Sequence, residues 1–287
     1  MIYGLGAALG WGLGDLWAAM SGRRIGALAT VVVAQLVSAI LTTLIVLASG
    51  TSLAPMGRVA WWLIPNAVLM SGGYFTLYRG LELGPVAVVS PVLASYAVFP
   101  VLLSVMLLGE SLSLLIGAGI VVTIVGTALA STDLRALARG THSMPEGLPW
   151  AAASVILFGV GTYVFGWAAQ RAGWLPTLWL TRISTTMVFL LVGAAAWGLG
   201  RTEGGRARHE RRALAFAALI GFVDLFGAVM YAYGADVGYI SIVTAASATY
   251  PIIPVLGSML FLRERPAPNQ YLGVVLLVGG LLAVSLG

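Results

Sequence analysis

The sequence predicts an all-α integral membrane protein with ten transmembrane helices arranged in two inverted five-helix repeats. Sixty per cent of its 287 residues are hydrophobic and nine per cent are charged, which is too little charge to cover the surface of a soluble protein of this length. Ten apolar segments are each long enough to cross a bilayer, and a long stretch of the first half recurs in the second half. These three observations together predict the fold class.

The apolar segments follow one another along the whole chain, and a spanning helix needs about 20 such residues. They lie at 2–20, 26–48, 59–78, 85–108, 112–131, 148–170, 174–198, 212–233, 239–262 and 269–286. Residues 1–20 have no basic leading region, so we interpret them as the first spanning helix rather than a signal peptide. We expect a first repeat at 1–131, a connecting loop at 132–147 and a second, inverted repeat at 148–287.

The internal repeat aligns Gly80–Gly126 with Gly234–Gly280 without a gap, and glycines, prolines, tyrosines and acids coincide. The first helix repeats at a different shift, where Trp11–Gly14 meets Phe158–Gly161. Both alignments place the length difference in the same connection, after the second helix of each half. Because five is odd, the two copies enter the membrane from opposite sides. This inverted layout is common among secondary transporters.

The basic residues predict the orientation, and all fifteen of them are arginine. Twelve lie in the connections after helices 1, 3, 5, 7 and 9, whereas Arg58 and Arg171 lie on the other side. Arg182 falls inside the seventh helix, where it either snorkels to the interface or pairs with an acid. Because cytoplasmic loops are rich in arginine, we expect a multi-pass protein of the cell (inner) membrane with both termini external. The arginines act as orientation signals in this interpretation, so no nucleic-acid partner is expected.

The chain has no cysteine, and its histidines, His142 and His209, lie in polar connections. Disulfides, thiolate metal sites and a histidine metal centre are therefore not expected. The sequence contains no Walker-type motif, which argues against ATP-driven transport within this chain. We expect neither a metal nor a cofactor.

Three features resemble the drug/metabolite transporter superfamily, and more narrowly its EamA-type members, which include amino-acid and metabolite exporters. They are Trp11-Gly12 in the first helix, the block Gly84–Glu110 repeated at Gly238–Glu264, and the two inverted sets of five helices. The resemblance covers essentially the whole chain. It implies a central cavity lined by helices 1, 3, 4, 6, 8 and 9, with helices 5 and 10 behind, and transport directed outward. Many relatives keep both termini cytoplasmic, whereas the arginine count here favours the reverse.

Two carboxylates lie inside predicted spanning helices, where a charge costs at least about 2.5–3.5 kcal/mol and usually faces a cavity or a partner. Asp224 is central in the eighth helix. It either couples transport to protons or binds a substrate ammonium group, or it is hydrogen-bonded and locks helix 8 to a neighbour. Asp15 shares a face of the first helix with Trp11. It either has one of the same two functions or lies near the membrane surface and pairs with Arg23 and Arg24.

Aromatic and hydroxyl side chains recur on the helices that the resemblance assigns to the cavity. They suit an amphipathic or aromatic organic solute through stacking or cation–π contact; helix packing and interface belts are the alternative. Besides Asp15 and Asp224, the expected substrate-binding or coupling residues are Trp11, Tyr74, Tyr78, Ser95, Tyr96, Phe99, Tyr163, Trp167, Tyr231, Ser247 and Tyr250.

Four prolines lie in helices 4 and 9. Proline frees backbone carbonyls of a spanning helix, so we expect these helices to kink and to act as gates. The gating residues are Pro91, Pro100, Pro251 and Pro254. Neighbouring hydroxyls either contribute to the cavity or bond to the backbone and stabilise the kink.

We therefore expect a secondary transporter, and from the resemblance an exporter, of a small organic solute such as an amino acid, a metabolite or an amphipathic amine. It would work by alternating access and would not be an enzyme. A membrane-embedded enzyme acting on lipid or isoprenoid substrates is one alternative, but it needs convergent acids, histidines or a metal cluster. A passive channel is another. The expected partners are the solute, the lipid bilayer and a coupling proton, and a homodimer is left open.

Overall fold

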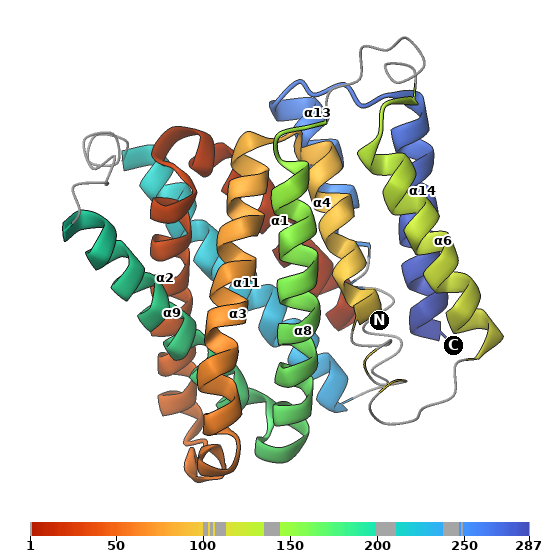
Figure 1. The fold of residues 1–287 in the computed structure, drawn as a ribbon. Helices are drawn as coiled ribbons and strands as arrows, with labels where there is room; N and C mark the ends of the chain where they lie inside the picture. The colour runs from red at the N-terminus through yellow and green to blue at the C-terminus, as the bar shows by residue number, and fades with distance from the viewer. Residues whose placement is uncertain are drawn as a thin grey trace.

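The computed structural model describes residues 2–99, 103, 106, 113–134, 144–198, 211–237, 247 and 249–286, and within these the chain is helical, with no strand (Figure 1). The first half contains α1 (Ile2–Ile25), α2 (Ala27–Ser49), α3 (Ala60–Leu83), α4 (Val86–Ala94) and α6 (Leu114–Ser131), with the 3₁₀ helices η1 (Ala54–Arg58) and η2 (Ser95–Ala97). The second half contains α8 (Leu148–Ala172), α9 (Trp174–Gly198), α11 (Arg211–Val237), α13 (Ile252–Phe261) and α14 (Pro268–Leu286).

These ten α-helices follow the ten apolar segments of the sequence, so the predicted all-α fold is confirmed. The fourth and ninth segments are described only in part, and Pro100 lies outside the described residues. The first helix continues to Ile25, beyond its expected end. Both termini lie at the same end of the bundle (Figure 1), as an even number of crossings requires.

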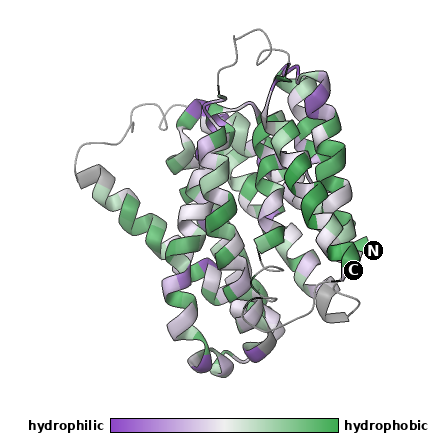
Figure 2. Cartoon of the chain, turned by 45° about the vertical axis from the view of Figure 1, so that its right-hand side comes forward, coloured by the Kyte–Doolittle hydropathy of each residue, from purple (hydrophilic) through white to green (hydrophobic). Residues whose placement is uncertain are grey.

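The lengths and surfaces of the helices suit a bilayer. In the described part of the chain, α2, α8, α9 and α11 are both long and apolar enough to cross, and α6, α13 and α14 are shorter apolar helices. The 24 residues of α1 and of α3 extend about 36 Å, more than the hydrocarbon core of about 30 Å. Large apolar side chains such as Leu47 and Leu260 point outward, whereas Asp15 and Arg182 are buried. Figure 2 shows hydrophobic residues along the helices and hydrophilic ones gathered near their ends.

The turn between the first two helices of each half shows the repeat in atomic detail. Gly26 has φ +83° and Gly173 has φ +86°, a conformation that side-chain-bearing residues rarely adopt. Each glycine N–H donates to the carbonyl four residues earlier, and each glycine carbonyl accepts from a threonine N–H, that of Thr30 or Thr177. The two turns are equivalent at the shift that aligns Trp11 with Phe158, so that alignment holds in the structure.

The packing of the helices has the symmetry of two inverted repeats. α1 packs against α11, and the equivalent helix α8 packs against α3, which is the equivalent of α11. α2 packs against its own equivalent α9, α4 against α13, and α6 against α14. A pseudo-twofold axis therefore passes between these three pairs. Figure 1 shows α6 and α14 side by side at one edge of the bundle and α2 and α9 toward the other.

The α6–α14 pair is held at close range by glycines. A Cβ on Gly126 would overlap the backbone of Leu277, and one on Gly280 would lie 2.5 Å from the backbone nitrogen of Thr123. Small residues let helix backbones approach closely in a membrane. The pair packs against α4 and lies at one edge of the bundle (Figure 1).

Candidate functional site

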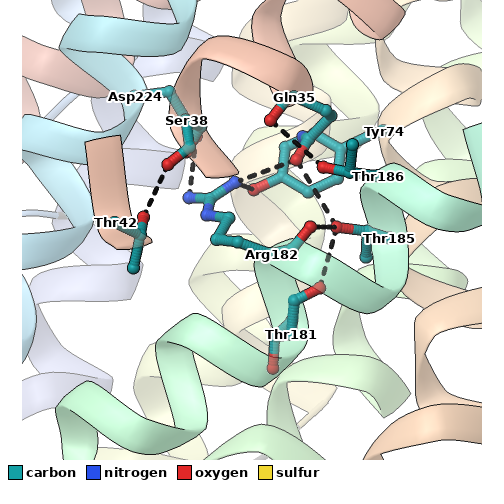
Figure 3. A network of polar contacts seen from close by, with 9 residues as sticks. All are labelled: Gln35, Ser38, Thr42, Tyr74, Thr181, Arg182, Thr185, Thr186 and Asp224. Atoms are coloured by element: carbon teal, nitrogen blue, oxygen red, sulfur yellow. Dashed lines mark hydrogen bonds and ion pairs between the residues drawn. The ribbon is translucent and has the colours of Figure 1, made fainter. Parts of the chain in front are cut away.

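Two oppositely charged side chains meet in the middle of the bundle. Arg182 of α9 and Asp224 of α11 form an ion pair with an Nη2–Oδ2 distance of 2.7 Å, and their side chains are 5% and 15% exposed (Figure 3). Removing either charge from such a site leaves the other buried and unpaired, which is strongly unfavourable. The contact fits two of the alternatives left open by the sequence, in which Arg182 pairs with an acid and Asp224 locks its helix to a neighbour.

Neutral groups from α2, α3 and α9 complete the surroundings of Arg182. Its Nη1 donates to the Tyr74 hydroxyl at 2.8 Å and to the Gln35 Oε1 at 3.5 Å. The guanidinium also lies 5.6 Å from the centre of the Tyr74 ring, within cation–π range. Thr186 donates to the Gln35 carbonyl at 3.1 Å. Figure 3 shows Gln35 of α2 and Tyr74 of α3 converging on the guanidinium, with Thr186 of α9 beside Gln35.

Asp15 of α1 makes no direct contact with this ion pair within the described residues, and it is 7% exposed. Ser90 of α4 donates a hydrogen bond to its Oδ2 at 2.7 Å. Arg23, which the surface interpretation of Asp15 required as a partner, instead forms an ion pair with Glu264 at 2.8 Å. Asp15 is therefore an interior carboxylate that accepts from a hydroxyl of a neighbouring helix.

Aromatic rings surround the same face of α1. Trp11 lies one turn before Asp15, and its ring centre is 5.6 Å from that of Tyr231 and 6.4 Å from that of Tyr250. A Cβ on Gly227 would lie 2.8 Å from Trp11 Cδ1, so the glycine makes room for the indole against α11. The Tyr250 hydroxyl donates to the Ser90 carbonyl at 3.5 Å. Trp11, Tyr231 and Tyr250 thus come together beside the helix that carries Asp15.

A second aromatic group lies in the equivalent place of the other repeat, around Phe158. Tyr74 packs edge-on against Phe158 at 5.0 Å and against Tyr78 at 6.4 Å, and Tyr96 lies 6.1 Å from Phe158. Phe99 contacts the position that a Cβ of Gly159 would occupy. Phe158 was not among the expected site residues, although its alignment with Trp11 was a signal that could have identified it.

Other expected residues lie elsewhere. Trp167 packs 5.8 Å from Trp62 and lies 4.2 Å beneath the Arg171 guanidinium, away from both aromatic groups and in the kind of setting an interface belt provides. Tyr163 is half-buried on α8 and Ser247 is buried. Ser95 donates to the Val92 carbonyl at 2.6 Å, which is the hydroxyl-to-backbone bond considered for the kinks.

The prolines occupy helix interiors and starts. Pro91 lies inside α4, which is followed at Ser95 by the 3₁₀ turn η2. Pro251 precedes the first residue of α13, and Pro254 is buried within it. The α-helix thus changes to a 3₁₀ turn four residues after Pro91.

An ion network joins five elements at the end of the bundle that contains the α1–α2 turn, the end of α3 and the segment after α13. We call this the arginine-rich end. Glu264 accepts from Arg23 at 2.8 Å and from the Ala87 N–H of α4 at 3.0 Å. Glu82 accepts from Arg79 at 2.8 Å and from the Ala27 N–H of α2 at 3.1 Å. Each carboxylate thus stabilises the N-terminus of a helix as well as an arginine.

Both halves of the chain match one known protein family. The model of the EamA-like transporter family matches residues 1–132 and again residues 145–286. The chain belongs to the EamA-like transporter family. This EamA-like transporter is accordingly a membrane protein that carries small solutes, and its two matched stretches follow the two repeats. No curated protein matches it.

A solved structure supports the fold of this EamA-like transporter. It is titled "Crystal structure of protein", has 19% sequence identity and a TM-score of 0.68, and the alignment covers 99% of this chain and 96% of that chain. At this identity the likeness shows the fold alone. Within the described residues, no group of three His, Asp or Glu side chains is arranged to hold a metal ion.

Proposed function

We propose that this transporter exports a small organic solute by alternating access, in which the two repeats exchange conformations. The observation that carries the proposal is an asymmetry between the halves. α1 packs against α3, whereas the equivalent helices α8 and α11 do not pack closely in the described part of the chain. An inverted repeat whose copies adopt different conformations supplies the two states that a carrier exchanges.

The ion network supports an assignment of the closed side. It joins α1, α3, α4 and the segment after α13 at the arginine-rich end, the same end at which α1 meets α3 through Gly22 and Glu82. In the proposed cycle this end is closed, and separation of α8 from α11 opens the opposite end. With the arginine-rich end cytoplasmic and both termini external, as the arginine count favours, the arrangement is the one that releases an exported solute.

Asp15, Asp224 and the two aromatic groups are the proposed substrate and coupling residues. The carboxylates lie on α1 and α11, which pack against each other, and the aromatic groups lie on either side of the pseudo-twofold axis. Pro91, Pro251 and Pro254 allow α4 and α13 to bend during the exchange. A proton carried by either carboxylate would couple transport to a pH gradient.

The test is uptake into proteoliposomes that contain the purified protein. A pool of amino acids, nucleosides and quaternary amines is offered with and without a pH gradient to wild type, Asp15→Asn, Asp224→Asn and the control Glu146→Gln, whose side chain is exposed. We expect gradient-driven accumulation that is lost in one of the first two variants and retained in the control. Uptake that ignores the gradient and both substitutions would leave facilitated exchange, and no uptake of any solute would contradict the proposal.

A further inference from the structure

The carboxylate of Asp15 has no positive partner among the described residues. Within the described residues, its hydrogen-bond donor is the neutral hydroxyl of Ser90 at 2.7 Å, and the residue is 7% exposed. Arg182 and Arg23 form ion pairs with other carboxylates, Arg182 with Asp224 and Arg23 with Glu264. A carboxylate inside a membrane protein normally pairs with a cation or faces the substrate pathway. The charge of Asp15 is therefore available to a cation that the chain does not itself supply.

The rings beside Asp15 provide faces for such a cation. Trp11 and Tyr231 are tilted by 39° to each other, and Trp11 and Tyr250 by 87°, so the three rings are not stacked in one direction. The rings come from α1, from α11 and from the segment that leads into α13. Aromatic faces, tryptophan above all, attract ammonium groups within about 6 Å. A carboxylate with three differently oriented rings is the arrangement that recognises an organic ammonium ion.

The second aromatic group, around Phe158, resembles the first, but one of its rings contacts a cation that the chain itself supplies. Phe158 and Tyr96 are the repeat equivalents of Trp11 and Tyr250, and they lie 6.1 Å apart, close to the 6.4 Å of the first pair. Tyr74 packs against Phe158 and contacts the guanidinium of Arg182. Tyr74 of this second aromatic group thus contacts a cation of the chain itself, the Arg182 guanidinium, which pairs with Asp224.

The two repeats differ at the position that Asp15 occupies in the first repeat. The residue in the position of Asp15 in the second repeat is Thr162, so a carboxylate next to the aromatic pair occurs in the first repeat alone. The first repeat holds an acid without a cation, and the second holds a cation–acid pair with Arg182 supplied by α9. The group around Phe158 therefore lies against the internal Arg182–Asp224 pair, whereas the group around Trp11 is open to a ligand.

We propose that Asp15, Trp11, Tyr231 and Tyr250 form the binding site for an organic ammonium ion and that the transported solute belongs to this class. The inference rests on the proposed function and names its substrate class. The ammonium group contacts the Asp15 carboxylate and the indole face of Trp11, and the two tyrosines enclose its organic substituents. Gly227 keeps the indole in position, because any side chain there would overlap it. The Arg182–Asp224 pair holds α9 to α11 and does not contact the solute.

The experiment compares three small aromatic probes of similar shape and different charge. Isothermal titration of the purified protein in lipid nanodiscs uses phenyltrimethylammonium, neutral 2-phenyl-2-propanol and benzenesulfonate. We expect wild type to bind the cation in preference to the other two. Asp15→Asn should weaken its binding by about tenfold or more, and Trp11→Leu by a similar factor, because each removes a principal attraction. Trp11→Phe should lose less, and Glu146→Gln should match wild type.

A second measurement needs no variant. Dicyclohexylcarbodiimide modifies membrane-buried carboxyl groups, and peptide mass spectrometry reports the fraction of Asp15 modified. Phenyltrimethylammonium should protect Asp15 while the neutral and anionic probes should not. Equal binding of the neutral or anionic probe, undiminished binding by Asp15→Asn, or absence of both binding and protection would each overturn the proposal. If the solute pool is still transported in that case, the carrier function stands and only the ammonium class fails.

Discussion

Gln35 and Arg182 occupy the same position in the two repeats, 147 residues apart, and they contact each other across the pseudo-twofold axis, with Arg182 Nη1 donating to Gln35 Oε1 at 3.5 Å. Thr185 also points its hydroxyl at Gln35 Oε1 at the same distance. Where the axis passes between α2 and α9, it therefore runs through a polar contact. The neutral member of the pair accepts a hydrogen bond, and the charged member relies on Asp224 for its counter-charge.

The Arg182–Asp224 pair predicts a non-additive effect of substitution on stability. Asp224→Asn leaves the guanidinium of Arg182 buried without its partner, so we expect a loss of about 3–5 kcal/mol in the free energy of unfolding. Removing both charges with Arg182→Met and Asp224→Leu should recover most of that loss. Thermal or denaturant unfolding in detergent measures both variants. The single variants Arg182→Met and Asp224→Leu complete the cycle, and a double variant as unstable as their sum would show that the two side chains are not coupled.

The glycine contact between α6 and α14 predicts a position-specific effect of one methyl group. Gly126→Ala places a Cβ against the backbone of Leu277, so the helices must separate, and we expect destabilisation by about 1–3 kcal/mol. Gly117→Ala on the same helix is the matched control, because nothing lies within 4 Å of its added Cβ. Unfolding midpoints of the two variants check the expectation. If Gly117→Ala were as harmful as Gly126→Ala, helix propensity or lipid contact would explain the loss instead of helix–helix packing.

The ion network at the arginine-rich end predicts that Glu264 controls access from that side. The chain has no cysteine, so a single reporter such as Val89→Cys, at a fully buried position of α4, can be labelled without background. In Glu264→Gln the contacts to Arg23 and to the start of α4 weaken, and modification by an impermeant methanethiosulfonate from that side should become several-fold faster. Glu146→Gln provides the comparison. Unchanged reactivity of the cysteine would indicate that the network stabilises the fold in every state and does not control access.

The arginine distribution predicts the orientation in the membrane. A cysteine at Ser52, in the connection after α2, should react in intact cells with an impermeant maleimide. A cysteine at Glu146, at the arginine-rich end, should react only after the cells are opened. Both side chains are exposed, so the difference reports sidedness and not burial. The reverse pattern would place both termini in the cytoplasm, as in many relatives.

The repeat and the number of helices could be predicted because they depend on properties that the sequence displays directly. Glycines such as Gly26 and Gly173 must recur where a positive φ recurs, and apolar segments must have the length of a bilayer. The partnership of Arg182 with Asp224 depends on how α9 and α11 are rotated toward each other. Hydrophobic periodicity does not report that rotation in a membrane, where the lipid-facing and packed surfaces are both apolar.

The candidate site was predictable in part for the same reason. Helical spacing correctly placed Trp11 and Asp15 on one face of α1, since residues four apart share a face. It gave Tyr163 and Trp167 a common face too, but Trp167 packs with Trp62 instead of joining the aromatic groups. Spacing fixes which side chains point the same way, and only the packing of neighbouring helices fixes where that face points.

The ion network at the arginine-rich end also bears on how the carrier divides its time between states. Two identical inverted repeats would give both states the same free energy. The equivalents of Arg23 and Arg79 in the second repeat are Gln170 and Tyr233, so these two charges have no equivalent at the opposite end. The proposed cycle is therefore biased toward the state closed at the arginine-rich end. Mobile ions screen partly exposed charges over about 8 Å at physiological salt. The bias should therefore become weaker as the ionic strength rises in the compartment that faces the arginine-rich end.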